Sequence, residues 1–406
     1  MKGCLQSCTL VCLRTRKEIA MKNVYSNVAC AGMDVHYKFS NVTFSDPGGK
    51  VVRRERLVHP LRRELQEHLN RWPPGIPIVM EASFGWGWLS DLLDEAGLET
   101  HLSNCYKVEQ MREARGWVKT NKKDADLLSL LPFEQSDWWK VWRAPLEVRN
   151  RREHKRFRGD LVALQTMVKN RIHALFHRHG IFHEFSDLFG GQGRKFLVEL
   201  CLHNPTQLSP EGLLALRGQV KLLDHLRQQL ADVAWILHNQ LVKTSLIRRL
   251  KTIQGIGVIL AHVLAAEIGR IERFRNQKAL ACYSLLAPRS EDTGEHDPRH
   301  SPLGRHLGVR GNRTLKWAFI EAAHGAVRSG GRWRAMFDRV TDGGQKDRNR
   351  GYIKVARELV KAVYVVWKKD VTYGEAPPPR GGANRRKKSR SGTGQLYHPM
   401  VHAHRA

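Results

Sequence analysis

The chain has 406 residues, enough for two or three domains and more than one hydrophobic core. It carries 68 lysines and arginines against 39 acids, a formal net charge of +29, yet 41% of its residues are hydrophobic and 11 are tryptophans. This composition excludes a disordered polycation of the histone-tail type. It predicts a folded protein with a polyanionic partner, for which nucleic acid is the default.

The sequence offers neither a membrane anchor nor a cysteine framework. Its apolar stretches fall short of the roughly 18 residues that a spanning helix needs, so an anionic membrane surface is the weaker candidate partner. The seven cysteines contain no CxxC pair, which argues against a disulfide scaffold and a zinc ribbon. The first residues lack a convincing cleavage site for secretion. We interpret the protein as cytoplasmic, with Met21 as an alternative start.

Residues 28–144 are expected to form an α/β domain after an N-terminal extension, residues 1–27. Hydrophobic alternation predicts a meander of three strands, which a helix, a strand, a second helix and a last strand follow. Three meandering strands followed by alternating helices and strands are typical of an α/β sheet. In chain order, the elements fall in residues 28–46 (two strands), 49–58, 61–72, 76–83, 87–97 and 99–106.

Residues 145–249 show the period of long helices and predict an extended arm. Apolar residues recur every three or four positions in two segments, and a loop region rich in glycine separates the segments. Two such helices can pack as an antiparallel coiled coil or as a dimer zipper, and both arrangements stay open. The first segment contains Phe157, Leu161, Leu164, Val168, Ile172 and Leu175, the second contains Leu223, Leu226, Leu230, Val233 and Leu237, and the loop region is marked by Gly190, Gly191, Gly193 and Pro205.

Residues 250–370 predict a mainly helical C-terminal domain, interrupted by a loop from Pro288 to Arg313. Residues 371–406 form a basic, low-complexity tail, for which disorder is expected. No repeat of fixed period is visible along the chain.

Acidic residues stand out at three places in this basic chain. Asp34 lies among apolar residues of the first strand, and Glu81 follows the apolar core of the strand in residues 76–83. Either acid, taken singly, is more often a surface or salt-bridged residue, because a buried charge needs a cation or an arginine as partner. A helix that begins near Thr120 adds Asn121 and Asp124, one turn apart on the same face. Together these oxygen donors suit a Mg²⁺ site for phosphodiester chemistry.

Cations and glycines near these acids suit a nucleic-acid backbone. Lys119, Lys122 and Lys123 flank the start of the helix and are expected to hold the backbone of the substrate. Gly255 and Gly257 lie between helical stretches and resemble a helix-hairpin-helix turn, whose backbone N–H groups approach a phosphate closely. A tight helix connection without a ligand is the alternative for these glycines.

The loop of residues 288–313 adds hydroxyl groups and arginines. Ser290, Thr293 and Ser301 offer hydroxyls for covalent attack on a phosphate, and arginines offset the charge on the group that is transferred. On its own, the segment is more often an exposed polar loop. The arginines are Arg289, Arg299, Arg305, Arg310 and Arg313.

Short motifs spread over residues 28–365 resemble the DEDD transposases of insertion sequences, which are related to the Piv-type DNA invertases. The motifs are GMDVH, MEAS, a KT-x-x-x-DA helix start, and the series GIG, AEIG, LAPR, TG and G-N-R-x-L. The resemblance implies a RuvC-like, RNase H-type N-terminal domain, a helical arm and a C-terminal transposase domain with a serine nucleophile. It also implies DNA recombination through a covalent phosphoserine, and a structured guide RNA encoded by the element.

Carried over residue by residue, the resemblance places acids of the family at Asp34, Glu81 and Asp124, the expected ligands of Mg²⁺. The family's third acidic position falls on Asn121 in this chain. This departure removes one negative charge from the site, although an amide carbonyl can still coordinate Mg²⁺.

The family's nucleophile falls on Thr293, where the added methyl group restricts χ1 and crowds the attack, and Ser290 is the alternative hydroxyl. A metal-dependent nuclease or junction resolvase, which needs no hydroxyl, is the first alternative function. A nucleic-acid-binding protein without enzymatic activity is the second. Because recombination at two sites needs more than one active centre, a homodimer or homotetramer is expected.

Overall fold

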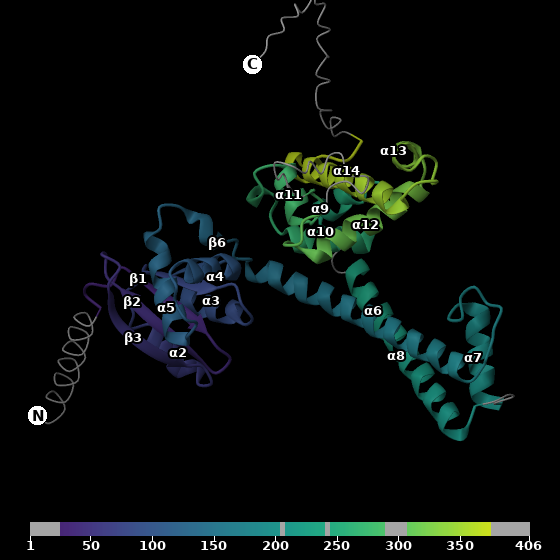
Figure 1. The fold of residues 1–406 in the computed structure, drawn as a ribbon, viewed down its shortest axis with the longest axis horizontal. Helices are drawn as coiled ribbons and strands as arrows, with labels where there is room; N and C mark the ends of the chain where they lie inside the picture. Colours follow the sequence, from purple (N-terminus) through teal and green to yellow (C-terminus); the bar gives the residue numbers. More distant parts are fainter. Residues whose placement is uncertain (1–24, 204–207, 240–243, 289–306, 375–406) are drawn as a thin grey trace, which may run out of the picture. The chain divides into compact units, whose positions relative to one another are not determined.

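The computed structural model describes residues 25–203, 208–239, 244–288 and 307–374 (Figure 1). The chain divides into two compact units, Met1–Ala163 and Leu164–Ala406, and each is described by itself. The expected N-terminal extension lies outside the described residues except for residues 25–27, and the basic tail lies outside them from residue 375 on.

The N-terminal unit is built on a six-stranded mixed sheet, which confirms the predicted α/β domain. The strand order is β3-β2-β1-β4-β5-β6. The first three strands form an antiparallel meander, β1, β4 and β5 run parallel, and β6 is antiparallel to β5. The strands are β1 (Cys30–Val35), β2 (Phe39–Ser45), β3 (Val51–Val58), β4 (Pro77–Glu81), β5 (Glu99–Ser103) and β6 (Lys140–Val141). The sequence prediction missed only the two-residue β6, whose pairing depends on contact with the distant β5.

Four α-helices accompany the sheet: α2 (Arg62–Leu69), α3 (Trp86–Glu95), α4 (Cys105–Ala114) and α5 (Asn121–Leu130). The predicted helix starts of α2, α3 and α5 are confirmed, and Thr120 caps α5 by accepting a hydrogen bond from the Lys123 N–H at 3.2 Å. The sequence analysis missed α4. Its cap is Asn104, whose side chain accepts hydrogen bonds from Tyr106 N–H and Lys107 N–H, a local signal for a helix start.

The helices cover both faces of the sheet. Alternate residues of β4 divide between the faces, because successive side chains of a strand point in opposite directions. Ile78 and Met80 join the core with α2 and α3, whereas Val79 joins the core with α4 and α5. Tyr25, which the sequence analysis leaves in the N-terminal extension, packs in the first of these cores, and its hydroxyl donates to Glu55 at 2.6 Å.

Helix α5 lies directly against β1 at a glycine. A Cβ atom on Gly32 would meet the backbone oxygen of Ala125 at 2.2 Å and the backbone nitrogen of Ser129 at 2.2 Å. On the same face of β1, the Cys30 thiol donates a hydrogen bond to the Ser129 carbonyl at 3.0 Å. Because strand residues alternate between faces, Asp34 also belongs to the face that α5 covers.

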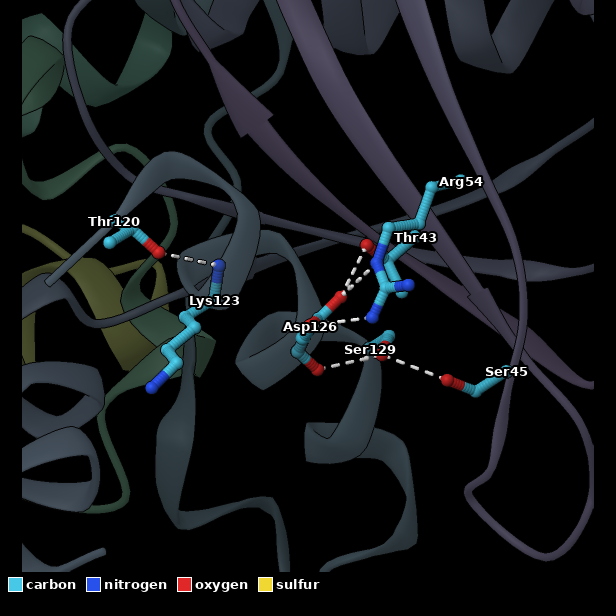
Figure 2. Close-up of polar contacts among 7 residues, drawn as sticks. All are labelled: Thr43, Ser45, Arg54, Thr120, Lys123, Asp126 and Ser129. Carbon is cyan, nitrogen blue, oxygen red and sulfur yellow. Dashed lines mark hydrogen bonds and ion pairs between the residues drawn. The ribbon is translucent and has the colours of Figure 1, made fainter. Parts of the chain in front are cut away.

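Polar contacts hold α5 over the neighbouring strands β2 and β3. Asp126 accepts a hydrogen bond from Thr43 at 2.8 Å and two from the Arg54 guanidinium at 2.9 Å each (Figure 2). One turn later, the buried hydroxyls of Ser129 and Ser45 lie 2.9 Å apart. Because its carboxylate is paired in this way, Asp126 stabilises the packing of α5 on the sheet and is not available to bind a metal ion.

Within the described residues, the regular secondary structure of the C-terminal unit is helical apart from an isolated bridge between Pro288 and Leu307, which confirms the expected helical region. Helix α6 begins in the N-terminal unit and continues into this one. No described helix has the length and apolar character needed to cross a membrane. The helices are α6 (Leu146–Arg178), α7 (Gly191–His203), α8 (Pro210–Asn239), α9 (Ser245–Leu250), α10 (Val258–Ile268), α11 (Gln277–Tyr283), α12 (Arg313–Arg328), α13 (Gly331–Thr341) and α14 (Arg348–Lys369).

The prediction of a glycine-rich loop between the two long helices is wrong in part, because this region contains α7. Gly191 and Gly193 form the first turn of this helix, and a Cβ at position 193 would meet the Leu188 carbonyl oxygen at 2.3 Å. The glycine is therefore required by close packing of backbones. Phe196 on α7 contacts Phe176 of α6, and Arg194 on α7 pairs with Asp224 of α8.

The predicted apolar stripes of α6 and α8 are buried in part. On α6, Leu161 and three later members are buried, but Phe157 and Leu164 expose 48% and 43% of their surface. On α8, Leu223, Leu226 and Val233 are buried. Their packing as a coiled coil stays a prediction.

We predict that Gly32→Ala will lower the free energy of unfolding of the protein by about 3 kcal/mol, because backbone atoms of α5 cannot yield to the new Cβ without displacing the helix. Denaturant unfolding followed by circular dichroism measures the change. Gly159→Ala in α6 is the control: its Cβ meets nothing within 4 Å, and alanine should stabilise the helix by up to about 1 kcal/mol. Equal stability of the Gly32→Ala protein and the wild type would refute the argument.

Candidate catalytic site

Asp34 and Glu81 lie at the same edge of the sheet on neighbouring parallel strands. Met33 on β1 is paired with Met80 on β4, and each acid is the next residue of its strand. Asp124 stands in the first turn of α5, directly before Ala125, the residue whose carbonyl contacts Gly32. The strand register and the close seat of α5 thus bring three acids that are far apart in sequence to one place.

The three carboxyls lie close enough to act on one another electrostatically. Burial raises the pKa of Glu81, and the negative charges of Asp34 and Asp124 raise it further. Burial also raises the pKa of Asp34, with Asp124 adding to the effect, and burial raises the pKa of Asp124. Lys119 opposes the rise in the pKa of all three acids, so its ammonium group faces the same place. The raised pKa values mean that the positive charge around these half-buried carboxylates does not offset their burial and mutual repulsion.

This donor set fits a hard divalent cation. Carboxylate oxygens are the ligands that Mg²⁺ prefers, and an ion would offset both the burial and the mutual repulsion of Asp34, Glu81 and Asp124. Within the described ranges, no three His, Cys, Asp or Glu side chains are already drawn together at the spacing of a metal cluster.

Two residues that the sequence analysis missed contact these acids. His36 Nε2 lies 3.0 Å from Asp34 Oδ2, and the Cys105 thiol is hydrogen-bonded to Glu81. His36 follows Asp34 by two residues and so shares its side of the chain, which is a signal that alternation could have given. Cys105 begins α4 directly after β5, and only the pairing of β4 with β5 places it beside Glu81.

The start of α5 carries the remaining residues predicted for this end of the molecule. Asn121 is the first residue of the helix and is exposed, three residues before Asp124 and therefore on the same face. Lys119, Lys122 and Lys123 are exposed beside it, as a backbone-binding role requires. The Lys123 ammonium lies 6.0 Å from the centre of the Trp117 ring.

Two exposed aromatic residues flank the acids. Tyr37 follows Asp34 by three residues and is 90% exposed, and Phe84 follows Glu81 by three residues and is 100% exposed. Single exposed rings are common on protein surfaces, and Phe182 of the C-terminal unit is also 90% exposed, so exposure alone marks no site here. Such rings can stack on nucleobases, because every base has an aromatic face.

The residues predicted in the C-terminal domain are placed only in part. Thr293, its alternative Ser290, and the arginines Arg289 and Arg305 lie outside the described residues. Arg313 is exposed as the first residue of α12, after the cap residue Asn312.

Gly255 and Gly257 occupy the turn between α9 and α10, as expected, but their surroundings differ. Gly255 has a φ of +87°, and a Cβ there would meet the Ala322 carbonyl of α12 at 2.2 Å, so this glycine serves helix packing. Gly257 caps α10 in open space and is exposed. Only Gly257 thus has room beside it for a phosphate.

Comparison with known proteins finds two transposase domains that segments of this chain match. Residues 31–181 match the DEDD transposase domain of IS110 elements, and residues 247–338 match the domain described as "Transposase IS116/IS110/IS902 family". Two segments of the chain thus match transposase domains of the IS110/IS116 type. The sequence prediction of a DNA transposase as the enzyme class is therefore confirmed, and DNA is its partner.

The chain also resembles individual transposases along most of its length. It is 23% identical to the transposase for insertion sequence element IS1328 of Yersinia enterocolitica, over 73% of this chain and 83% of that protein. It is 23% identical to a probable family 20 transposase of Pseudomonas aeruginosa, over 74% of this chain and 85% of that protein. An insertion element IS110 protein of Streptomyces coelicolor, with no described function, is 29% identical over 32% of this chain and 31% of its own length.

We predict that Glu81→Gln will raise the melting temperature of the metal-free protein at neutral pH. Because the folded Glu81 binds its proton more tightly than the unfolded chain does, its contribution to stability is lost as the pH rises from the ordinary value of 4.5 through the raised pKa. Glutamine has no charge to repel Asp34 and Asp124, so the rise should be roughly 2–4 °C and should disappear at acidic pH.

Thermal unfolding at several pH values tests this expectation. Glu64→Gln, on the exposed side of α2, is the matched control and should leave the melting temperature unchanged. A Glu81→Gln protein that melts lower than the wild type at neutral pH would contradict the electrostatic account of the site.

Proposed function

We propose that this IS110-type protein cuts and rejoins DNA at an insertion sequence, with an RNase H-like, RuvC-like N-terminal domain that holds Mg²⁺ on Asp34, Glu81 and Asp124. The observation that carries the proposal is the convergence of the three acids, which the β1–β4 register and the Gly32–α5 contact produce. The order of strands, a three-strand meander followed by parallel strands with helices, supports the RNase H-like assignment. The proposal includes the domain limits expected from the sequence: the N-terminal domain ends at residue 144, and the helical arm ends at residue 249.

The acids, the amide and the lysines divide the work at the N-terminal site. When bound, Mg²⁺ would activate the scissile phosphate and offset its charge. Asp34, Glu81 and Asp124 provide the oxygen ligands, and the carbonyl of Asn121 assists them. Three exposed lysines, at positions 119, 122 and 123, hold the backbone on either side by charge.

The covalent step falls to a hydroxyl of the C-terminal domain. The oxygen of Thr293 attacks the phosphorus and forms a phosphothreonine bond, while the bond between phosphorus and the leaving DNA oxygen breaks. The proton of the threonine hydroxyl ends on that leaving oxygen, so that the step is balanced without an oxidant or a reductant. Reversal with a different DNA end rejoins the strands. Arg289, Arg305 and Arg313 are expected to offset the charge on the phosphate.

The remaining features of the proposal follow from the resemblance to the DEDD transposases and Piv-type invertases. They are a structured guide RNA, a homodimer or homotetramer joined by a coiled-coil arm, and a cytoplasmic location. The pair of long helices α6 and α8 supports such an arm.

We predict that Asp34→Asn will lower the rate of Mg²⁺-dependent cleavage by about a hundredfold or more, because one ligand charge is lost from the site. Cleavage is measured on a supercoiled plasmid that carries the ends of the element. Fluorescence anisotropy should show DNA binding within twofold of the wild type. Asp160→Asn, on the exposed face of α6, makes the same chemical change elsewhere and should cleave normally. Normal cleavage by the Asp34→Asn protein would remove the metal site from the mechanism.

We further predict that Thr293→Ala will bind DNA but form no covalent protein–DNA adduct, since alanine has no oxygen to attack phosphorus. Adducts are detected on denaturing gels after incubation with plasmid and Mg²⁺. Ser290→Ala is the matched control and should retain the adduct. The opposite pattern would assign the nucleophile to Ser290. Cleavage with no adduct, even for the wild type, would favour a metal-dependent nuclease.

A further inference from the structure

A basic groove lies on the C-terminal unit where the end of α12, helix α13 and the start of α14 meet. The cavity has a volume of about 280 Å³. Arg328 is the last residue of α12, Arg334 lies in the first half of α13, and Arg348 is the first residue of α14. All three arginines line the cavity, together with the rings of Phe337 and Tyr352. None of these residues is used in the function proposed above.

The positive charge of the groove is only partly balanced. Arg334 donates to both carboxylate oxygens of Asp338 at 2.9 Å. In the described parts of the chain, neither Arg328 nor Arg348 has an acidic partner, and both are exposed. Two guanidinium groups that converge on one hollow without a counter-charge repel each other, so an anion in the hollow would be stabilised.

The floor of the groove is aromatic and rigid. The ring of Tyr352 lies 3.7 Å from that of His324 and 4.7 Å from that of Phe337, measured between ring centres. A Cβ on Gly351 would meet Thr341 at 2.5 Å and Phe337 at 2.7 Å, so the missing side chain lets α14 pack closely on α13. A floor of low polarity strengthens the attraction between an arginine and a phosphate, because less water screens the charges.

The wall between α13 and α14 is an ordered turn. Gly343 and Gly344 have φ values of +68° and +96°, a conformation that glycine adopts without strain. The buried Thr341 accepts hydrogen bonds from Lys346 N–H at 2.7 Å and, through its hydroxyl, from Gly344 N–H at 3.0 Å. The turn therefore fixes the backbone of α13, which carries Arg334, relative to the start of α14, which carries Arg348.

We propose that this groove binds the phosphodiester backbone of DNA and so forms a docking site on the C-terminal unit. The proposal rests on the proposed function, because it takes the transposase's DNA as the occupant. Three features favour a DNA backbone over a solvated basic face. The two arginines without acidic partners line the same groove. Each guanidinium group can bind two phosphate oxygens at once. The net charge of +29 attracts the chain to a polyanion. Because the groove reads phosphate, it should bind without regard to sequence.

The test compares two double variants of the full chain that lose equal charge. Arg328→Ala with Arg348→Ala removes the unpaired arginines of the groove. Arg339→Ala with Arg350→Ala removes two exposed arginines from α13 and α14 that do not line it. Anisotropy with a labelled 30-base-pair DNA duplex of random sequence, without Mg²⁺, gives the affinity and its salt dependence, and thermal unfolding verifies that both variants fold.

We predict that the groove variant will bind DNA roughly ten- to a hundredfold more weakly. The negative slope of log affinity against log salt should become shallower by about 2, because two phosphate contacts are lost. The control variant should lose less than threefold. Equal losses in the two variants, or no loss in the groove variant, would overturn the proposal. An RNA duplex of the same sequence is measured in parallel, and weakening with RNA alone would also overturn it.

Failure of this inference can be told from failure of the proposed function. Binding without Mg²⁺ does not depend on Asp34, so the groove can be confirmed even where Asp34→Asn cleaves normally. In the reverse case, Asp34→Asn abolishes cleavage while the groove variant binds DNA as the wild type does. That result would refute the groove proposal and leave the proposed function standing.

Discussion

The contact between Gly32 and α5 is the constraint on which the rest of the N-terminal unit depends. Strand β1 and the helix approach so closely that their backbones touch, with no room for a side chain at position 32. This approach buries the middle of α5 from Ala125 on and places Asp124 beside the ends of β1 and β4. The pairing of Asp126 with Arg54 and Thr43 then fixes the helix on the meander. An acidic site is thereby built on rigid elements, which is where precise geometry is easiest to maintain.

The two units carry complementary charge features, acids in the N-terminal unit and arginines in the C-terminal unit. The N-terminal unit gathers three half-buried acids whose raised pKa values indicate too little local positive charge, with Lys119 as the nearby cation. The rest of the chain is strongly basic, and its groove of arginines on α12, α13 and α14 has the opposite need. A polyanion and a divalent cation together satisfy both, which is the combination that phosphodiester chemistry on DNA uses.

Local patterns account for the elements that the sequence predicted, and longer contacts account for two that it missed, β6 and α7; the missed α4 had a local signal in its cap residue Asn104. Alternation in β1 to β5 and the Thr120 cap of α5 are properties of neighbouring residues, so they are readable without a structure. Strand β6 has two residues and exists only through its pairing with β5. Helix α7 was hidden because Gly193 looks like a loop residue, whereas its role is to let the helix start approach the Leu188 backbone.

The sequence by itself determined the fold class, the order of most elements and which acids lie near the strand ends, because periodicity and capping act over a few residues. Only the tertiary structure decided that these acids are neighbours, since their meeting depends on the register of β1 with β4 and on a backbone contact across more than 90 positions. The same holds for Cys105 beside Glu81 and for the arginine groove. Each depends on surfaces of distant segments, and local physical chemistry carries no record of which surfaces will pack together.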